Sequence, residues 1–253
     1  MASKPTILFA GGGSGGHIFP NIAILERLEE KKLKVEPLFA VSNRSLDAQV
    51  LKENELDYLP LSVRPLSSRP WHWPAFLRCW WRSVAEVSQA IKERDIKAVL
   101  ATGGFVSGPA IAAASKMGIA SALVNLDAVP GKANRHAAAK ARKVFSVYQT
   151  PMLPGADPIG MPLRRVAIGP KDKAAARREL GLDPSKETLL VTGASQGASS
   201  INKRMITLVN LAQAQKALRS WQVFHQCGDK EEQELRVAYQ QAQVPAIVVP
   251  FCH

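Results

Sequence analysis

The sequence has few cysteines and no long apolar run. Its three cysteines, Cys79, Cys227 and Cys252, form no Cys-x-x-Cys pair. We therefore expect neither a disulfide framework nor a zinc site, but free thiols in a reducing compartment. No apolar stretch reaches the roughly 20 residues that cross a bilayer, and no signal-peptide pattern precedes Thr6. An integral membrane protein and a secreted protein are therefore not expected.

Acidic residues are scarce relative to basic ones. Lys and Arg number 33 against 21 Asp and Glu, a formal charge of +12, and this excess favours an anionic partner. Segment 132–143 holds five bases and no acid, which fits either a solvated helix face or an anion-binding surface. No zinc-finger, RNP or homeodomain pattern is present, so nucleic acid is not an expected partner.

Composition is that of a folded globular protein, with 46% hydrophobic and 21% charged residues. Strand-like runs alternate with helical periodicity, which predicts an α/β fold with a parallel, doubly wound sheet. We expect strands at 6–10, 35–41, 97–101, 120–124 and 144–147, a helix after the first glycine loop, and helices over 82–93 and 109–117.

Three prolines between 151 and 158 indicate a linker. We place the boundary after residue 160, giving a first domain of 1–160 and a partial second domain of 161–253. The second domain begins as the first does, with a strand, a glycine loop and a helix. Its expected elements are a helix at 174–180, strands at 188–192 and 246–249, a turn at 193–197 and a long helix at 200–217.

The first glycine loop carries five glycines within residues 11–16. Such a loop lets main-chain N–H groups approach an anion closely, so it favours phosphate binding. It fits the G-x-G-x-x-G dinucleotide pattern, but the next strand ends in Ser42-Asn43-Arg44 without the acid that NAD binding requires. Arg44 leaves NADP open as an alternative, and no Walker lysine follows the loop.

The second loop, Gly193 to Gly197, fits the G-x-S-x-G nucleophile elbow of α/β-hydrolases. That alternative would use Ser195 with Asp229 and His253. The same loop would equally present small residues and a hydroxyl to a phosphate at a helix N-terminus.

Four motifs occur in the order and rough spacing of one known family. They are the glycine-rich segment Ile7 to Pro20, Thr102-Gly-Gly-Phe-Val-Ser-Gly-Pro109, Gly160-Met-Pro-Leu-Arg164 and Gly193-Ala-Ser-Gln-Gly-Ala198. On these residues the sequence resembles the MurG family of peptidoglycan glycosyltransferases. The resemblance implies a GT-B fold, with two Rossmann-like domains facing a cleft. It also implies inverting transfer of N-acetylglucosamine from UDP-N-acetylglucosamine to the muramyl sugar of lipid I, an undecaprenyl pyrophosphate, to form lipid II.

Residue roles follow from the resemblance, position by position. His17 would be the general base, since a helix N-terminus disfavours the imidazolium form and leaves a neutral ring able to accept a proton. A purely structural histidine, a simple turn at Gly103 and a surface position for Arg164 are the alternatives. The implied substrate-binding residues are Ser14, Gly15, Gly16, Gly103, Gly104 and Phe105 in the glycine loops, and Arg164 and Ser195 for the nucleotide.

Two departures from the family pattern stand out. Val124-Asn-Leu-Asp127 replaces the usual His-Glu-Gln-Asn, so Asp127 takes the Asn position, while Asn134 is kept; we expect both to contact substrate. The match also stops at His253, where the family continues. We therefore expect a fragment with an incomplete donor pocket that does not itself transfer sugar. No Asp-x-Asp pair occurs, so neither a metal nor another cofactor is expected.

Four of the five tryptophans lie between Trp71 and Trp81, interleaved with arginines up to Arg82. Aromatic rings beside cations suit an anionic membrane surface, although a core helix would show a similar pattern. The resemblance implies a peripheral protein on the cytoplasmic face of the bacterial membrane. Three hypotheses remain: the glycosyltransferase, the Ser195 hydrolase, and a nonenzymatic membrane-surface binding fragment.

Overall fold

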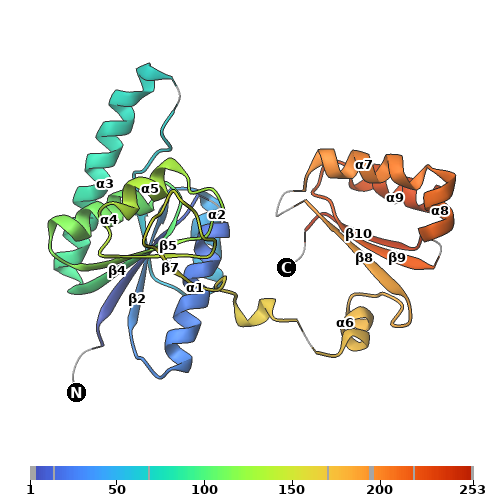
Figure 1. Cartoon of the computed structure of the whole chain (residues 1–253), viewed down its shortest axis with the longest axis horizontal. Coiled ribbons are helices and arrows are strands. Elements are labelled where there is room, and N and C mark those ends of the chain that lie inside the picture. Colours follow the sequence, from blue (N-terminus) through green and yellow to red (C-terminus); the bar gives the residue numbers. More distant parts are fainter. Residues whose placement is uncertain are drawn as a thin grey trace. The chain divides into compact units, whose positions relative to one another are not determined.

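The computed structural model describes residues 4–13, 15–67, 69–169, 171–193, 197–218 and 220–251. The chain divides into two compact units, residues 1–168 and 169–253. Figure 1 shows the first unit in blue to yellow and the second in gold to red, beginning with α6. Each unit is an α/β structure built on a parallel sheet.

The first unit has a seven-stranded sheet in the order β3-β2-β1-β4-β5-β6-β7, and every neighbouring pair is parallel. The expected strands are confirmed. The sequence analysis did not name β3 and β7, which are short edge segments with weak periodicity. The strands are β1 (Thr6–Gly11), β2 (Glu36–Ser42), β3 (Tyr58–Leu61), β4 (Ile96–Gly103), β5 (Ala120–Asn125), β6 (Lys143–Ser146) and β7 (Asp157–Pro158).

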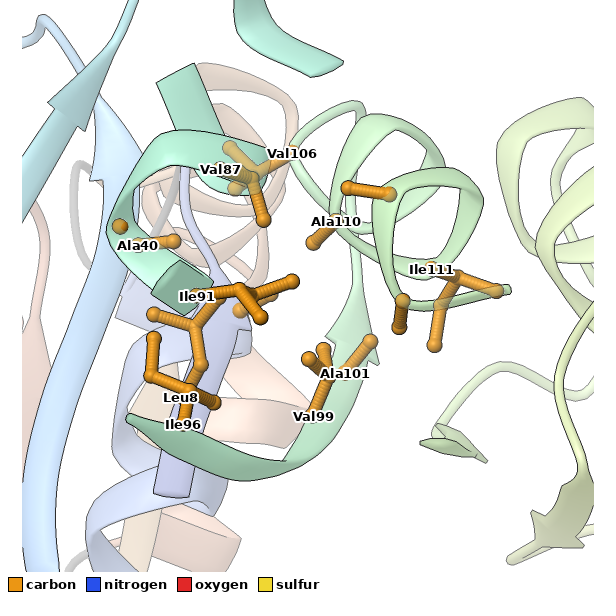
Figure 2. Close-up of a cluster of buried hydrophobic side chains, with 14 of the residues drawn as sticks. Leu8, Ala40, Val87, Ile91, Ile96, Val99, Ala101, Val106, Ala110 and Ile111 are labelled. Atoms are coloured by element: carbon orange, nitrogen blue, oxygen red, sulfur yellow. The ribbon is translucent and has the colours of Figure 1, made fainter. Parts of the chain in front are cut away.

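Helices cover both faces of this sheet because successive side chains of a strand point to opposite sides. Leu8 of β1 packs in the cluster formed with α3 and α4, whereas Phe9 packs in the cluster formed with α1 and α2. Figure 2 shows Val87 of α3 and Ala110 of α4 above Leu8. The helices are α1 (Gly15–Glu30), α2 (Ser45–Glu53), α3 (Trp73–Glu93), α4 (Ser107–Lys116) and α5 (Lys132–Ala138), with short 3-10 turns at Pro70–His72 and Arg165–Ala167.

Strand order reverses between β1 and β4, which lie side by side although most of the first half of the unit separates them in sequence. In open parallel sheets, ligands bind outside the carboxyl ends of the strands at this reversal. Gly11 ends β1 and Gly103 ends β4, and the two residues are register partners. The topology therefore brings the two glycine loops of the first unit to one edge.

The second unit has a three-stranded parallel sheet in the order β10-β9-β8. Its core joins these strands to α7 and α9 through residues such as Val223, Leu235 and Val248. The elements are α6 (Lys173–Glu179), β8 (Glu187–Thr192), α7 (Ser199–Val209), α8 (Ala212–Leu218), β9 (Trp221–Gln226), α9 (Glu232–Gln241) and β10 (Ala246–Val249).

The prediction of one long helix over 200–217 is wrong, because the segment forms α7 and α8 with a break at Asn210. Asparagine competes with helical backbone bonds and is a poor helix former. Gln215 then donates from Nε2 to the Val209 carbonyl at 3.0 Å, which satisfies an acceptor that the end of α7 leaves open.

The unit boundary lies at Ile168, eight residues after the predicted one. Arg164 and Arg165 explain this difference. Arg165 donates through Nε to Glu30 at 2.8 Å and through its backbone N–H to Glu26 at 2.8 Å, so the segment after the prolines is attached to α1. None of the helices described is long and apolar enough to cross a membrane.

Candidate active site

His17 lies in the first turns of α1 and is fixed by the end of β4. Its Nδ1 lies 3.2 Å from the Thr102 carbonyl oxygen, and Thr102 Oγ1 donates to the His17 carbonyl at 2.6 Å. A carbonyl only accepts, so Nδ1 donates and carries the proton in the neutral ring. Nε2 then holds the free lone pair, as a general base requires.

The loop of Gly103 and Gly104, which follows β4, packs directly on the His17 ring. A methyl group added at Gly103 would lie 2.9 Å from both Cε1 and Nδ1 of His17 and 3.2 Å from Nδ2 of Asn134. A methyl group at Gly104 would lie 2.6 Å from the Gly12 carbonyl. The two glycine loops, His17 and Asn134 therefore meet at the carboxyl edge of β1 and β4.

Asn134 of α5 is buried and belongs to a polar cluster at the end of β5. Its Nδ2 donates to Asn125 Oδ1 at 3.0 Å and to Asp127 Oδ2 at 3.4 Å. Asn134 Oδ1 is also buried and has no hydrogen-bond partner in the part of the chain that the structure describes. Buried acceptors are normally satisfied, so this oxygen keeps unused hydrogen-bonding capacity.

Asp47 of α2 braces the first glycine loop, and the sequence analysis did not identify it. Its side chain is fully buried, and Oδ2 accepts from Gly13 N at 2.8 Å, Ser42 N at 3.2 Å and Ser42 Oγ at 2.6 Å. The signal in the sequence was a serine at the end of β2 with a carboxylate five residues later, since polar groups at the carboxyl ends of parallel strands gather at one edge.

Phe105 packs against the first loop as well. A methyl group at Gly13, whose φ is +89°, would lie 2.6 Å from Phe105 Cε1, so glycine is required both for the backbone conformation and for the ring contact. Gly16 lies in α1 beside His17, and Gly15 is the first residue of that helix. Ser14 lies outside the described residues.

Arg164 has its contacts along α1 and the end of α2. Its Nη2 donates to Asn54 Oδ1 at 2.9 Å, its Nε lies 3.7 Å from Glu26 Oε1, and its guanidinium carbon lies 5.3 Å from the centre of the Phe19 ring. These contacts hold the linker to the first unit. A nucleotide contact for Arg164 stays a prediction.

In the second unit, the loop before α7 is pressed against the backbone after β9. Gly197 has φ +72°, and a methyl group there would overlap the Cys227 carbonyl. Asn202 of α7 donates from Nδ2 to the same carbonyl at 2.8 Å and to Glu231 Oε2 at 3.0 Å. Ser195 and His253 lie outside the described residues.

A neutral buried network supports this contact. His225 is fully buried; its Nε2 lies 3.1 Å from Asn202 Oδ1 and its Nδ1 lies 2.9 Å from the Tyr239 hydroxyl. Burial lowers the pKa of His225 and raises the pKa of Tyr239. Hydrogen bonds from Ser199 and Asn202 lower the pKa of Glu231.

The tryptophan segment forms the 3-10 turn at Pro70–His72 and the start of α3, and its rings divide into exposed and packed ones. Trp71 is 70% exposed and Trp81 65%, whereas Trp80 is partly buried against the first core cluster and lies edge-on to His136, with ring centres 5.5 Å apart. A cavity of about 510 Å³ opens here. Its lining includes Leu66, Phe76, Leu77, Trp80, Trp81 and Phe105 with Lys132, His136 and Lys140.

Comparison with known proteins covers both units. Residues 7–146 match the glycosyltransferase family 28 N-terminal domain, and residues 188–253 match the glycosyltransferase family 28 C-terminal domain. These ranges contain both loops of the first unit and the loop of the second.

Two relatives carry the same name, UDP-N-acetylglucosamine–N-acetylmuramyl-(pentapeptide) pyrophosphoryl-undecaprenol N-acetylglucosamine transferase. The relative from Clavibacter michiganensis subsp. michiganensis (strain NCPPB 382) is 34% identical over 231 residues, covering 89% of this chain and 62% of the relative. The relative from Nocardioides sp. (strain ATCC BAA-499 / JS614) is 32% identical over 252 residues, covering 97% of this chain and 67% of the relative. The chain thus spans about three fifths to two thirds of these two proteins' length.

The crystal structure of Acinetobacter baumannii MurG matches with a TM-score of 0.68 at 20% identity, covering 98% of this chain and 67% of that one. This likeness confirms the GT-B fold class. The family match extends over more than half of the chain and includes the residues around His17. The chain therefore belongs to glycosyltransferase family 28.

Proposed function

We propose that this chain belongs to an inverting hexosyltransferase that moves N-acetylglucosamine from UDP-N-acetylglucosamine to the muramyl sugar of lipid I, forming lipid II for peptidoglycan. The observation that carries the proposal is the His17 ring, held by the Thr102 carbonyl where two glycine loops meet. The names of the Clavibacter and Nocardioides relatives supply the donor and the pyrophosphoryl-undecaprenol acceptor.

In the proposed step, Nε2 of His17 takes the proton from the acceptor hydroxyl. The hydroxyl oxygen forms a bond to the anomeric carbon of N-acetylglucosamine from the side opposite UDP. The bond from that carbon to the UDP oxygen breaks, and UDP leaves with the electron pair, so the configuration inverts. The Thr102 contact keeps the proton on Nδ1, which leaves Nε2 available for the next turnover.

On the acceptor side, Asn134 Oδ1 would accept a hydrogen bond from the substrate, because it is buried and without a partner among the residues described. Asp127 lies beside it, 3.4 Å from Asn134 Nδ2, and would contact the same ligand. The remaining proposed acceptor contacts are Ser14, Gly15, Gly16, Gly103, Gly104 and Phe105. Arg164 and Ser195 remain the proposed donor contacts, and that the two units face one cleft is part of the proposal.

The hydrolase alternative is not favoured. The Gly193–Gly197 loop starts a segment that matches the family's C-terminal domain, in which the relatives are named as transferases. Gly197 also lies close to the Cys227 carbonyl, which gives this glycine a packing role in the second unit. Labelling of Ser195 by a fluorophosphonate would overturn this choice.

The transfer assay measures UDP release from UDP-N-acetylglucosamine with a short-chain lipid I analogue. It is run on this chain and on an extended version that adds the part of the Clavibacter relative that the chain does not match. We expect turnover by the extended version, and a loss of about 10²- to 10⁴-fold in His17→Ala with donor affinity retained, as for removal of a general base.

A His17→Gln variant separates base chemistry from packing, because glutamine keeps a hydrogen bond toward Thr102 but takes up no proton. It should be as inactive as His17→Ala while unfolding at the same temperature as the parent. Unchanged turnover in either variant removes His17 from the mechanism. No transfer by a folded extended version contradicts the proposed function.

We also propose that the start of α3 docks on an anionic membrane surface, which would make the protein peripheral to the cytoplasmic face. Trp71, Trp73, Leu77 and Trp81 are all at least half exposed, and Arg78 lies among them. Lys132 and Lys140 border the adjoining cavity. Exposed rings beside cations suit the headgroup region of a bilayer.

The docking test uses Trp71→Ser with Trp81→Ser. Trp80 is left intact, because a methyl group at Gly108 would lie 2.7 Å from its ring, so Trp80 packs against α4 and its loss would disturb the fold. We expect weaker co-sedimentation with phosphatidylglycerol vesicles, while Trp221→Ser, which removes a 40% exposed tryptophan from the second unit, binds as the parent does. Equal binding by the double variant refutes the docking surface.

A further inference from the structure

We propose that Arg44 is a further binding residue that contacts the diphosphate of the lipid-linked acceptor. This inference rests on the proposed function for the identity of the ligand, but its observations are independent of His17. Arg44 caps the start of α2 and is exposed at the carboxyl end of β2, the edge where both glycine loops of the first unit lie.

The Arg44 guanidinium joins the two glycine loops. Its Nη1 donates to the Gly13 carbonyl of the first loop. Its central carbon lies 5.8 Å from the centre of the Phe105 ring, which follows Gly103 and Gly104 in the loop after β4. Stacking on an aromatic face and a backbone hydrogen bond together fix the orientation of a long side chain that otherwise has considerable freedom.

Most of the Arg44 hydrogen-bonding capacity is left open. A guanidinium has five N–H donors, and only the Gly13 contact uses one in the part of the chain described. Other arginines of the unit, such as Arg27 and Arg165, pair with carboxylates. No carboxylate lies within ion-pair distance of Arg44 among the described residues, so its charge is available to a ligand.

Asp47 fixes the N–H of Gly13, the residue whose carbonyl anchors Arg44. Its buried carboxylate accepts the Gly13 N–H, so the peptide units on either side of Gly13 are fixed by Asp47 and by Arg44. The Gly13 N–H is thereby taken and cannot bind an anion itself. Recognition of negative charge at this point of the loop falls to the side chain of Arg44, whose planar fork matches phosphate oxygens.

The position favours the acceptor over the donor. Gly13 follows Gly12, whose carbonyl lies against Gly104 and hence beside the His17 ring. In the acceptor, the diphosphate is joined directly to the muramyl sugar that carries the reacting hydroxyl. When that hydroxyl reaches Nε2 of His17, its diphosphate must lie on the neighbouring part of the loops, where Arg44 is.

The test measures ligand binding to the whole chain by isothermal titration, without any transfer step. The probes are inorganic pyrophosphate, farnesyl diphosphate and UDP, applied to the parent, Arg44→Gln and Arg44→Lys. Arg94→Gln is the matched control, because it removes one exposed arginine of the same unit at the end of α3. We expect Arg44→Gln to weaken farnesyl diphosphate about 10-fold or more, and Arg44→Lys to recover part of the loss, while UDP binding stays the same.

Each outcome decides the inference. Equal binding of farnesyl diphosphate by the parent and Arg44→Gln overturns it, as does an equal loss in Arg94→Gln. If Arg44→Gln weakens only UDP binding, Arg44 contacts the donor, and the acceptor assignment is wrong. If Arg44→Gln weakens UDP and farnesyl diphosphate equally, Arg44 does not distinguish the two ligands, and the acceptor assignment is again wrong. The binding of farnesyl diphosphate could depend on Arg44 even though the extended version transfers no sugar. That pair of results would leave this inference standing and remove only the proposed function.

Discussion

The two units contain the same local pattern, a strand followed by a glycine loop and a helix, but they fix the loop by different chemistry. In the first unit, the buried carboxylate of Asp47 binds Gly13. In the second unit, Gly197 packs on the Cys227 carbonyl, which accepts a hydrogen bond from the neutral amide of Asn202. Asn202 in turn contacts the His225 ring and the Glu231 carboxylate. A loop whose N–H binds a buried carboxylate and a loop that packs on a backbone carbonyl should therefore respond differently to substitution.

The largest effect is expected from Gly197→Ala. The added methyl group would overlap a backbone carbonyl that cannot move without breaking the end of β9, and φ is +72°. We expect a loss of about 3 kcal/mol or more in the free energy of unfolding of the second unit. Hydrogen-exchange mass spectrometry, which reports each unit through its own peptides, measures this.

Gly13→Ala is the matched change in the first unit and should cost less, about 1–2 kcal/mol. The new methyl group would meet the Phe105 ring, which can move, whereas the second unit offers only backbone. A larger loss for Gly13→Ala than for Gly197→Ala would contradict this comparison.

Asp47→Asn sharpens the comparison by removing the charge and keeping the shape. The amide can still accept with one oxygen, but charge-assisted hydrogen bonds to Gly13 and Ser42 become neutral ones. We expect the first unit to lose about 1–2 kcal/mol while exchange in the second unit is unchanged. Ser42→Ala, which removes one of these bonds, should cost less than Asp47→Asn, and the reverse order would show that the charge is not what holds the loop.

Acidification should act on the second unit through His225. Its folded pKa is lowered by burial, so the unfolded chain binds the proton more readily. The stabilisation is complete above the ordinary value of about 6.5 and is lost as pH falls from there toward the folded pKa. The urea midpoint of the second unit should therefore fall between about pH 7 and pH 5.

His225→Gln should flatten that pH dependence, since glutamine does not titrate. A slope that stays the same in His225→Gln would assign the effect to another group. Glu231 acts in a lower window, because its pKa is lowered by Ser199 and Asn202 and its stabilisation is lost only as pH falls below the ordinary carboxylate value.

The sequence was sufficient to predict the parallel sheets, because buried strands and glycine loops leave strong local signals. It also placed His17, Gly103 and Asn134 in one site, through their family motifs. Asp47 and Arg44 were not assigned to the loop, because their roles depend on contacts across the sheet edge with Gly13, more than 30 residues away. Local periodicity carries no information about such contacts.

The break at Asn210 and the boundary at Ile168 have the same cause. Gln215 caps the end of α7 through a side-chain bond to the Val209 carbonyl, and Arg165 attaches the linker to α1 through an ion pair with Glu30 and a backbone bond to Glu26. Elements fixed by packing were predictable, whereas ends and boundaries fixed by single side chains were not.

The smallest effect is expected from Arg165→Ala. Its partner Glu30 is exposed, as is about half of the Arg165 side chain, so the ion pair contributes little to stability. We expect a change of less than about 1 kcal/mol in the unfolding of the first unit, together with faster proteolysis between residues 160 and 172. Unchanged cleavage there would show that Arg164 alone attaches the linker.

The central claim is that His17 presents an unprotonated Nε2 because Thr102 holds the proton on Nδ1. Long-range ¹H–¹⁵N correlation spectra of the ¹⁵N-histidine-labelled chain at alkaline pH test it directly, with His17→Gln assigning the signals. We predict a protonated Nδ1 and an unprotonated Nε2 for His17. A ring protonated on Nε2 would contradict the account, because that nitrogen could not then accept the proton of the acceptor hydroxyl.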